Sequence, residues 1–445
     1  MTGTEESPGA ERPRRLQPFV SFRYRNYRWL WAANVCAGAV AATQGFLITW
    51  LFIEALDRVY NRGATELIGA LPVLLLGLLA GRLADRRDRR LLLMGSHVGV
   101  SLILLLAAAL AAGGLLSFGL TLLLVSLGAA AAVFGRPVRL ALIPAIVPKE
   151  RILNANTLDT LGVGLGAMAL IPVTLGLSRG LPIEGAFVIL AAVSALGAVF
   201  LIPLRVPPRG PGQDEDGAAR EASGAPATGR GIMDGFRFLW RTVELRLLFV
   251  LLLTAMLIGP WAALHFGAAE ERLDITLRQW AVLYLFLSVG VIVSTIALAF
   301  VRRLTRAGTW YGALIVASAL AAVGVWFSSS YGLIGILMGL YGLAFGVRGL
   351  LLVTLVQSHT PIAVMGRVMG VFIVLTAAAG LLGPLITRAG QALLQDDGWI
   401  VFAGIVLVGV VAFVLVRNPG LRRMPSHPEP AGPADEGTAV APGPG

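Results

Sequence analysis

Long apolar runs recur along most of this chain, and polar stretches separate them. Each run approaches or exceeds the roughly 20 residues that an α-helix needs to cross a bilayer. With 56% hydrophobic and 14% charged residues and a mean hydropathy of +0.79, the chain is predicted to be a membrane protein. Because lipid offers the backbone no partner and the runs lack strand alternation, they are predicted to be helices.

The pattern predicts twelve membrane-spanning helices. They cover residues 29–56, 65–84, 91–113, 118–146, 157–178, 184–204, 245–268, 278–301, 308–328, 331–357, 366–390 and 398–416. If the N-terminus is cytoplasmic, 27 of the 36 Lys and Arg residues lie on that side, six lie opposite and three lie within spans. The positive-inside rule therefore predicts a multi-pass protein of the cell membrane with both termini cytoplasmic.

Composition and internal repetition predict the domain organisation. The expected segments are a cytoplasmic N-terminal arm (1–28), an N-terminal six-helix bundle (29–204), a cytoplasmic linker with an interfacial amphipathic segment (205–244), a C-terminal six-helix bundle (245–416) and a disordered cytoplasmic tail (417–445). The linker is rich in Pro, Gly and acidic residues, which is typical of disorder. Phe134-Gly135-Arg136 in the first half parallels Phe345-Gly346 with Arg348 in the second, as expected for duplicated transporter halves.

Several motifs resemble those of a known family. The segment 81–90 reads GRLADRRDRR, which is similar to the loop between the second and third helices of major facilitator superfamily transporters (Gly-x-Leu-Ala-Asp-Arg-x-Gly-Arg-Arg). Residues 22–28, 135–144 and 366–370 resemble the drug- and siderophore-exporter branch, which is related to macrolide efflux and enterobactin export proteins. The resemblance covers about residues 18–416. It implies an all-α fold of two pseudo-symmetric six-helix bundles.

The resemblance implies that the loop 81–90 is a conformational latch. Gly81 would let its helix approach a neighbour, and Asp85 would meet the N-terminus of the helix that begins near Gly366. The expected latch residues are Gly81, Asp85, Arg89, Arg90, Gly366 and Arg367. The alternative, favoured for Arg86 and Arg87, is that the arginines only fix topology. The family's second glycine is Asp88 here, at a position expected to have a positive φ.

Three arginines, Arg136, Arg139 and Arg348, fall well inside predicted spans and away from their ends, where a guanidinium normally faces a water-filled cavity or a counter-ion. Arg136 and Arg139 are three residues apart and share a helix face. The candidate cavity residues are Gln44, Arg136, Arg139, Trp261 and Arg348, with Gln44 and Trp261 chosen by family analogy. Arg139 resembles the helix-4 arginine that antiporters of the superfamily associate with proton coupling, although the Arg-x-x-Gln-Gly wording is absent. The alternative role for Arg139 is a structural ion pair with Asp159.

No Asp or Glu lies in the middle of a predicted span. The candidates for proton coupling are therefore Glu54, Arg139 and Asp159. The residues expected to pack or bend helices are Pro172, Gly380, Gly383 and Pro384. The last three resemble half of a Gly-Pro antiporter motif, and the alternative is that they only permit close packing.

These features predict a secondary active transporter. We expect a proton-coupled exporter that moves a small amphipathic molecule, such as a drug, siderophore or secondary metabolite, by alternating access. The paired arginines favour an anionic cargo, and nutrient import is the alternative. A membrane enzyme is disfavoured because zinc and paired-acid motifs are missing from the sequence. A sensor that transports nothing is disfavoured because the loop 81–90 would then have no evident role. The expected partners are a small molecule, protons and the lipid bilayer. We expect a monomer with no nucleic acid, cofactor or metal.

Overall fold

The computed structural model describes residues 19–50, 62–170, 173, 180–206, 230–259, 277–301 and 304–426. Every regular element within these ranges is a helix. The long helices are α1 (Arg25–Trp50), α2 (Arg62–Arg86), α3 (Arg89–Ala112), α4 (Phe118–Ala132), α5 (Gly135–Ile146), α6 (Ile152–Ala169), α8 (Ile183–Phe200), α10 (Arg230–Arg241), α11 (Val243–Leu257), α13 (Leu277–Phe300), α14 (Ala307–Phe327), α15 (Tyr331–Ser358) and α16 (Met365–Arg417). The short ones are η1 (Val20–Arg23), η3 (Lys149–Arg151), η5 (Ile362–Val364) and α17 (Pro419–Arg423).

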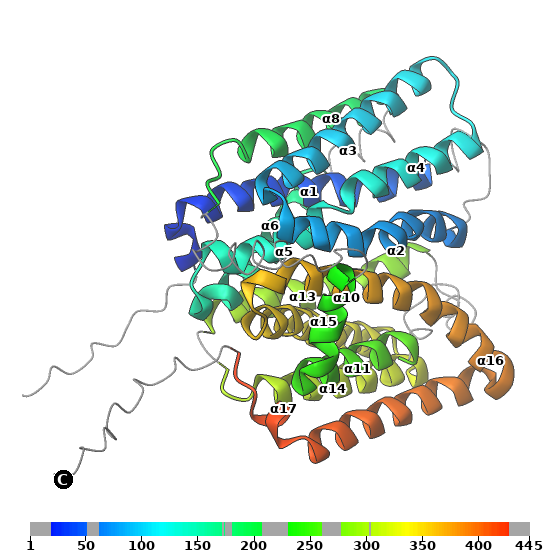
Figure 1. Ribbon diagram of the computed structural model, residues 1–445. Helices are drawn as coiled ribbons and strands as arrows, with labels where there is room; N and C mark the ends of the chain where they lie inside the picture. Colours follow the sequence, from blue (N-terminus) through cyan, green and yellow to red (C-terminus); the bar gives the residue numbers. More distant parts are fainter. Residues whose placement is uncertain are drawn as a thin grey trace, which may run out of the picture.

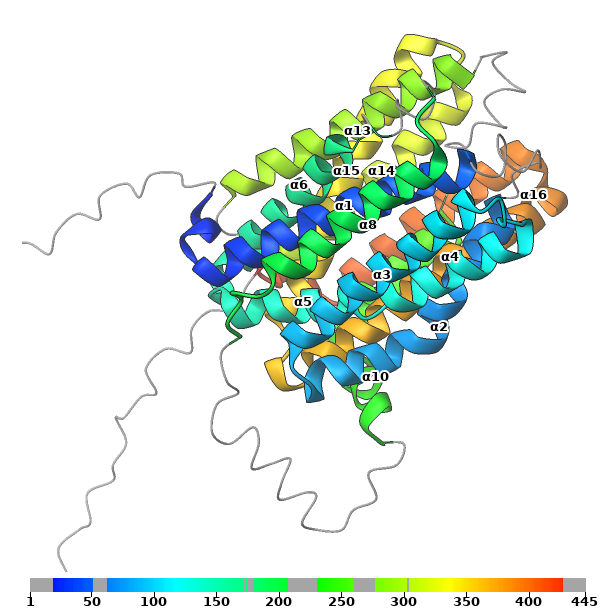
Figure 2. The same cartoon turned by 90° about the horizontal axis from the view of Figure 1, so that it is seen from above.

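The helices form two bundles that lie side by side. Figure 1 shows α1 to α8, coloured blue to green, above α11 to α16, coloured green to red, and Figure 2 shows the same packing from above. When α4 and α5 count as one span and the two arms of α16 as two, the described helices supply six spans to each bundle. This confirms the predicted all-α fold of twelve transmembrane helices in two six-helix bundles.

The outer surface of the bundles is apolar. Six helical stretches in the described ranges are long and apolar enough to cross a membrane. Large side chains on them point outward, including Leu102, Ile405 and Phe413, each at least 60% exposed. A surface of this kind is unfavourable in water and suits contact with lipid.

One end of the molecule gathers the arginine-rich connections. There α2 leads to α3, α5 leads to α6, and α15 leads to α16, and α1 begins. This end, at the left in Figure 1, is called the basic end below. The opposite end holds the turn between α3 and α4 and the bend of α16.

The last two predicted spans form one bent helix. α16 has 53 residues, about 80 Å at the α-helical rise, which is more than twice the thickness of a bilayer core. It folds back at Gln395, whose φ of 60° and ψ of 168° interrupt the helical conformation. The turn expected between residues 390 and 398 is therefore a sharp bend, and Figure 1 shows the resulting hairpin.

Two other boundaries differ from the sequence prediction. The span predicted at 118–146 is divided at Val133 and Phe134 into α4 and α5. The helix predicted to begin at residue 157 begins at Ile152, so Asn154 and Asn156 belong to a helix rather than to a loop. Hydropathy alone did not reveal either feature because both asparagines are polar and both sides of the break are apolar.

The two bundles use the same connection at the basic end. After α5, Pro148 precedes the short 3-10 helix η3 and then α6. After α15, Pro361 precedes η5 and then α16. The proline ends each span because the residue before a proline is pushed out of the helical region. The two halves of the chain therefore share this connection in structure.

Candidate functional site

Glycines bring α2 and α16 into backbone contact at the basic end. A Cβ atom on Gly81 would lie 2.6 Å from the Gly366 carbonyl oxygen and 2.9 Å from the Gly370 Cα. On the other side of the contact, a Cβ atom on Gly366 would lie 2.6 Å from the Gly81 carbonyl oxygen. No larger residue fits either position without separating the helices. α2 belongs to the first bundle and α16 to the second, so this contact joins the two.

Asp85, in the last turn of α2, binds the N-terminus of α16. Its Oδ1 accepts a hydrogen bond from Gly366 N at 2.7 Å, and its Oδ2 accepts from Arg367 N at 2.9 Å and from Arg367 Nε at 3.1 Å. The Asp85 side chain is 5% exposed. The helix N-terminus and the guanidinium both favour a negative charge here. Bonds to a buried carboxylate are among the stronger ones in proteins, each contributing about 1.5–3 kcal/mol.

Arg89 closes the same cluster from the start of α3. Its guanidinium lies 3.7 Å from Asp85 and donates to the carbonyl oxygens of Ala84 and Ala141, and more weakly to that of Ile362 at 3.5 Å. Because Ile362 belongs to the second bundle, Arg89 also spans the contact between the bundles.

The neighbouring residues Asp88 and Arg90 serve the first bundle alone. Arg90, expected in the charge network, instead donates through Nε to the Leu201 carbonyl at the end of α8. Asp88 has a φ of −60° and caps α3, accepting from the backbone of Arg90 and Leu91. The expected positive φ at Asp88 is therefore wrong, because an N-cap residue adopts an extended backbone.

A polar network that the sequence analysis missed joins the bundles beside this cluster. Asn156 Nδ2 donates to Gln357 Oε1 at 2.6 Å and to Thr354 Oγ1 at 3.0 Å, and Gln357 donates to the Leu140 carbonyl at 2.7 Å. Asn154 donates to the Ala299 carbonyl at 3.2 Å. All of these side chains are buried. The two bundles are thus closed against each other at the basic end.

A cavity of about 290 Å³ lies within the first bundle. Its polar lining residues are Asn34, Gln44, Ser96, His97, Arg136, Arg139 and Ser194. The two arginines come from one face of α5, as predicted. Of the five residues expected to line a cavity, Gln44, Arg136 and Arg139 are brought together here. Trp261 lies outside the described residues.

Arg139 forms an ion pair at the edge of the cavity. Its Nε lies 3.8 Å from Asp159 Oδ2, and Asn34 donates to Asp159 Oδ1. Asp159 and Asn34 are both buried. The ion pair weighed as an alternative for Arg139 is therefore present, and it does not remove Arg139 from the cavity wall. The third candidate for proton coupling, Glu54, lies outside the described residues.

His97 is another polar residue that the sequence analysis did not include among the cavity residues. It lines the cavity from α3, and its side chain packs against α8, where a Cβ atom on Gly197 would lie 2.5 Å from the imidazole. Ser194 of α8 donates to the His97 backbone carbonyl. The sequence offered one usable signal, a lone histidine in the middle of a predicted span.

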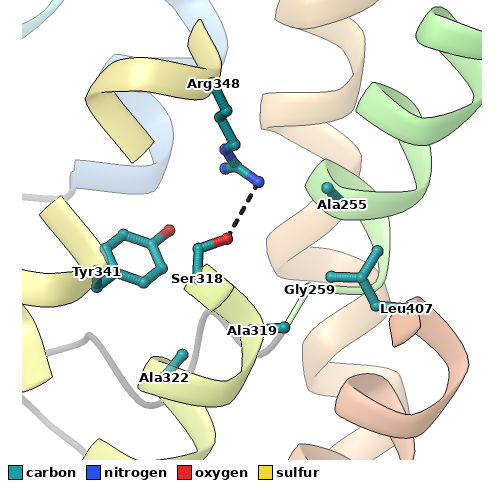
Figure 3. Close-up of a pocket in the computed structure, with 8 residues that line it drawn as sticks. All are labelled: Ala255, Gly259, Ser318, Ala319, Ala322, Tyr341, Arg348 and Leu407. Atoms are coloured by element: carbon teal, nitrogen blue, oxygen red, sulfur yellow. Dashed lines mark hydrogen bonds between the residues drawn. The ribbon is translucent and has the colours of Figure 1, made fainter. Parts of the chain in front are cut away.

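Arg348 lies in a different place, a narrow pocket of the second bundle (Figure 3). The pocket holds about 10 Å³, hardly more than one water. The Arg348 guanidinium lies 5.1 Å from the centre of the Phe345 ring and donates to Ser318 Oγ at 3.4 Å. The expectation that Arg348 would share a cavity with Arg136 is not met in this conformation.

The candidate packing residues behave differently from one another. A Cβ atom on Gly383 would lie 2.5 Å from the Met256 carbonyl oxygen, so Gly383 permits close contact between α16 and α11. Gly380 has no atom within 4 Å of the same position, and Pro384 lies inside α16. Pro172 lies outside the described residues.

Paired helical bundles with an apolar outer surface, a cavity lined by two arginines and a charged contact between the bundles at the basic end define a membrane transporter. The family model of the Major Facilitator Superfamily matches residues 30–384, and the chain belongs to this family. Members of the family generally carry out secondary active transport.

Solved structures of the family share this fold. The human organic anion transporter MFSD10 (TETRAN) matches with a TM-score of 0.60 and 17% identity, over 87% of this chain and 97% of that one. The Escherichia coli fucose:proton symporter FucP matches with a TM-score of 0.62 and 12% identity, over 89% and 99%. No curated protein sequence matches the chain.

Proposed function

We propose that this protein is a proton-coupled exporter of a small amphipathic organic anion, within the drug- and siderophore-exporter branch of its family. The observation that carries the proposal is the cavity of about 290 Å³ with two arginines on one wall. This volume suits a small organic molecule. Apolar residues, including Val40, Val100 and Val163, complete the lining, which suits an amphipathic cargo.

The arginines favour a carboxylate or another planar anion. A guanidinium binds such groups through two parallel hydrogen bonds. Arg136 has no carboxylate within ion-pair distance among the described residues, so its charge is available to a ligand. The family relative described as an organic anion transporter agrees with this reading. At 17% identity that likeness supports the fold, and the argument for the cargo depends on the arginines.

The Asp85 cluster is proposed to be the latch of alternating access. The basic end is closed by Asp85, Arg89 and the Asn156–Gln357 network. Opening this end would break the three hydrogen bonds that Asp85 receives from α16. If the basic end is cytoplasmic, as the charge distribution predicts, the structure is closed toward the cytoplasm.

One observation favours a second candidate function, import by proton symport. An anion bound to Arg139 would compete with Asp159, which lies 3.8 Å from the Arg139 Nε, and a proton bound to Asp159 would end this ion pair and free the guanidinium for the anion. Proton and anion would then bind together, as symport requires. Antiport of an anion needs a proton site with the opposite coupling, and Glu54 is the remaining candidate.

A single experiment separates these possibilities. Purified protein in liposomes is given acidic and cationic amphiphiles of matched size, and proton movement is followed with a pH-sensitive dye. We expect transport of the acidic compounds with protons moving in the opposite direction. Protons moving with the anion would establish symport, and preferred transport of the cations would contradict the proposed cargo. Arg90→Gln, which leaves the cavity untouched, is the matched control.

A further inference from the structure

The short helix α10 connects the linker to the second bundle and has two unlike faces. The face toward the protein carries Asp234, Gly235 and Leu239, which are partly or fully buried. The outer face carries Met233 and Trp240, at 50% and 53% exposure. The remaining exposed residues on that face are Phe236, Arg237 and Arg241. α11 starts at Val243, directly after α10, so α10 lies where a membrane span begins.

The inner face of α10 contacts the Asp85 cluster. Asp234 Oδ2 accepts a hydrogen bond from Arg367 Nη1 at 2.9 Å, while Arg367 Nε binds Asp85 and Arg367 Nη2 donates to the Ala363 carbonyl. A Cβ atom on Gly235 would lie 2.7 Å from the Arg367 carbonyl carbon, so α10 packs directly on the start of α16. Arg367 is thus held between one carboxylate from α2 and one from α10.

The outer face has the composition of a helix that lies on an anionic membrane surface. Phe236 and Trp240 stack with ring centres 5.6 Å apart, and the Arg246 guanidinium lies 5.7 Å from the Trp240 ring. Aromatic rings enter the boundary between headgroups and acyl chains, and arginines bind the headgroup phosphates. Figure 1 shows α10 crossing the neighbouring spans at a steep angle, as a helix in the membrane plane would.

We propose that α10 binds anionic phospholipid and that this binding stabilises the closed basic end. α10 contacts α2 of the first bundle as well as α16 and α11, so it touches both bundles at the closed basic end. A lipid surface that holds α10 flat keeps Asp234 on Arg367 and so orients the guanidinium toward Asp85. Orienting a long side chain in advance lowers the entropy lost when the latch forms. The inference rests on the latch role proposed above.

The test measures the conformation of the full-length protein in vesicles. Spin labels at Glu150→Cys and Thr305→Cys, in a Cys36→Ser background, report the separation of the bundles at the basic end, because both positions are exposed and lie on opposite bundles. One set of vesicles is phosphatidylcholine alone, and the other is an equal mixture with phosphatidylglycerol. We expect the anionic vesicles to raise the closed-to-open ratio by about fivefold, the effect of roughly one arginine–headgroup attraction.

Three variants assign the effect to α10. Arg237→Gln with Arg241→Gln should abolish the lipid response, and Asp234→Asn should abolish it by uncoupling α10 from Arg367. Arg422→Gln with Arg423→Gln removes the same charge from α17 at the same end and should leave the response intact. An equal closed fraction in both kinds of vesicle would overturn the proposal, as would an equal loss of response in the α17 variant.

A fourth variant separates this inference from the latch itself. Asp85→Asn should open the basic end in phosphatidylcholine, where no anionic lipid is present. If it does so while lipid composition has no effect, the latch stands and the lipid inference fails. If it leaves the closed fraction unchanged, the latch role fails and the lipid inference fails with it.

Discussion

Arg136 and Arg348 occupy related positions in the two bundles and have different surroundings. Arg136 lies just after the break between α4 and α5 and faces the cavity. Arg348 lies within the continuous helix α15 and is enclosed by Phe345 and Ser318. The comparison teaches that a duplicated fold can keep a charge in both halves and expose only one to a ligand.

The largest expected effect concerns the Arg139–Asp159 ion pair of the first bundle. Asp159→Ala leaves the partly buried Arg139 without its carboxylate partner, and it should lower the free energy of unfolding by about 3 kcal/mol. Cys36 is the only cysteine and is 6% exposed, so a thiol-reactive dye can follow thermal unfolding. Asp397→Ala in the second bundle removes the acceptor of Trp326 Nε1 and should cost about half as much. Equal losses of unfolding free energy in the two variants would show that the Arg139–Asp159 pair stabilises the protein no more than the Trp326–Asp397 hydrogen bond does.

The next effect concerns the glycine contact between the bundles. Gly81→Ala places a methyl group 2.6 Å from the Gly366 carbonyl oxygen and should destabilise the closed basic end by about 1–3 kcal/mol. Gly380→Ala places it in open space and should change nothing. Distances between spin labels on the two bundles measure both. A Gly81→Ala protein that closes normally would show that the two helices are not held at this contact.

A third prediction tests the comparison directly. Arg136→Gln should weaken binding of an acidic ligand about tenfold, the loss of one charge-assisted hydrogen bond. Arg348→Gln should leave that affinity unchanged and lower the free energy of unfolding by about 1 kcal/mol, because it loses the aromatic contact. Titration calorimetry and thermal unfolding separate the two outcomes. If both variants lose affinity equally, the two arginines share one cavity in the binding conformation.

The smallest expected effect comes from a substitution in α8 that should narrow the cavity by displacing His97. Gly197→Ala places a methyl group 2.5 Å from the His97 ring and should push the imidazole into the cavity. Since the ring has room on its cavity side, the cost in stability should be below about 1 kcal/mol, with a measurable loss of ligand affinity. Gly409→Ala, which meets no atom within 4 Å, is the control. Unchanged affinity would place the ligand away from His97.

Hydropathy and charge were enough to predict the fold. Apolar runs must become helices in lipid, and the basic connections reveal their alternation. The break at Val133 was not predictable, because apolar residues on both sides satisfy the same pattern. The start of α6 at Ile152, five residues before the predicted one, was missed because the residues there are polar. Asn154 and Asn156 are polar, and only their partners across the bundles, Ala299 and Gln357, explain their place in a buried helix.

The candidate site was predictable where neighbours in sequence share a face. Arg136 and Arg139 needed only the helical period, and the Arg139–Asp159 pair was weighed as an alternative role for Arg139. The roles of Arg348 and His97 depend on which side chains fill the surrounding space, which no spacing encodes. The same is true of Asp234, since its contact with Arg367 joins segments 133 residues apart.

The bend of α16 has a mechanical consequence. Since the two arms are separated only by the non-helical residue Gln395, we expect a displacement at the far surface to be transmitted along the first arm to Gly366. Leu393 lies beside that bend and is 83% exposed, so an antibody can reach the bend. An antibody fragment bound to the bend should therefore affect the contact between the bundles at the basic end. Its effect on the rate of exchange between conformations would measure the stiffness of α16.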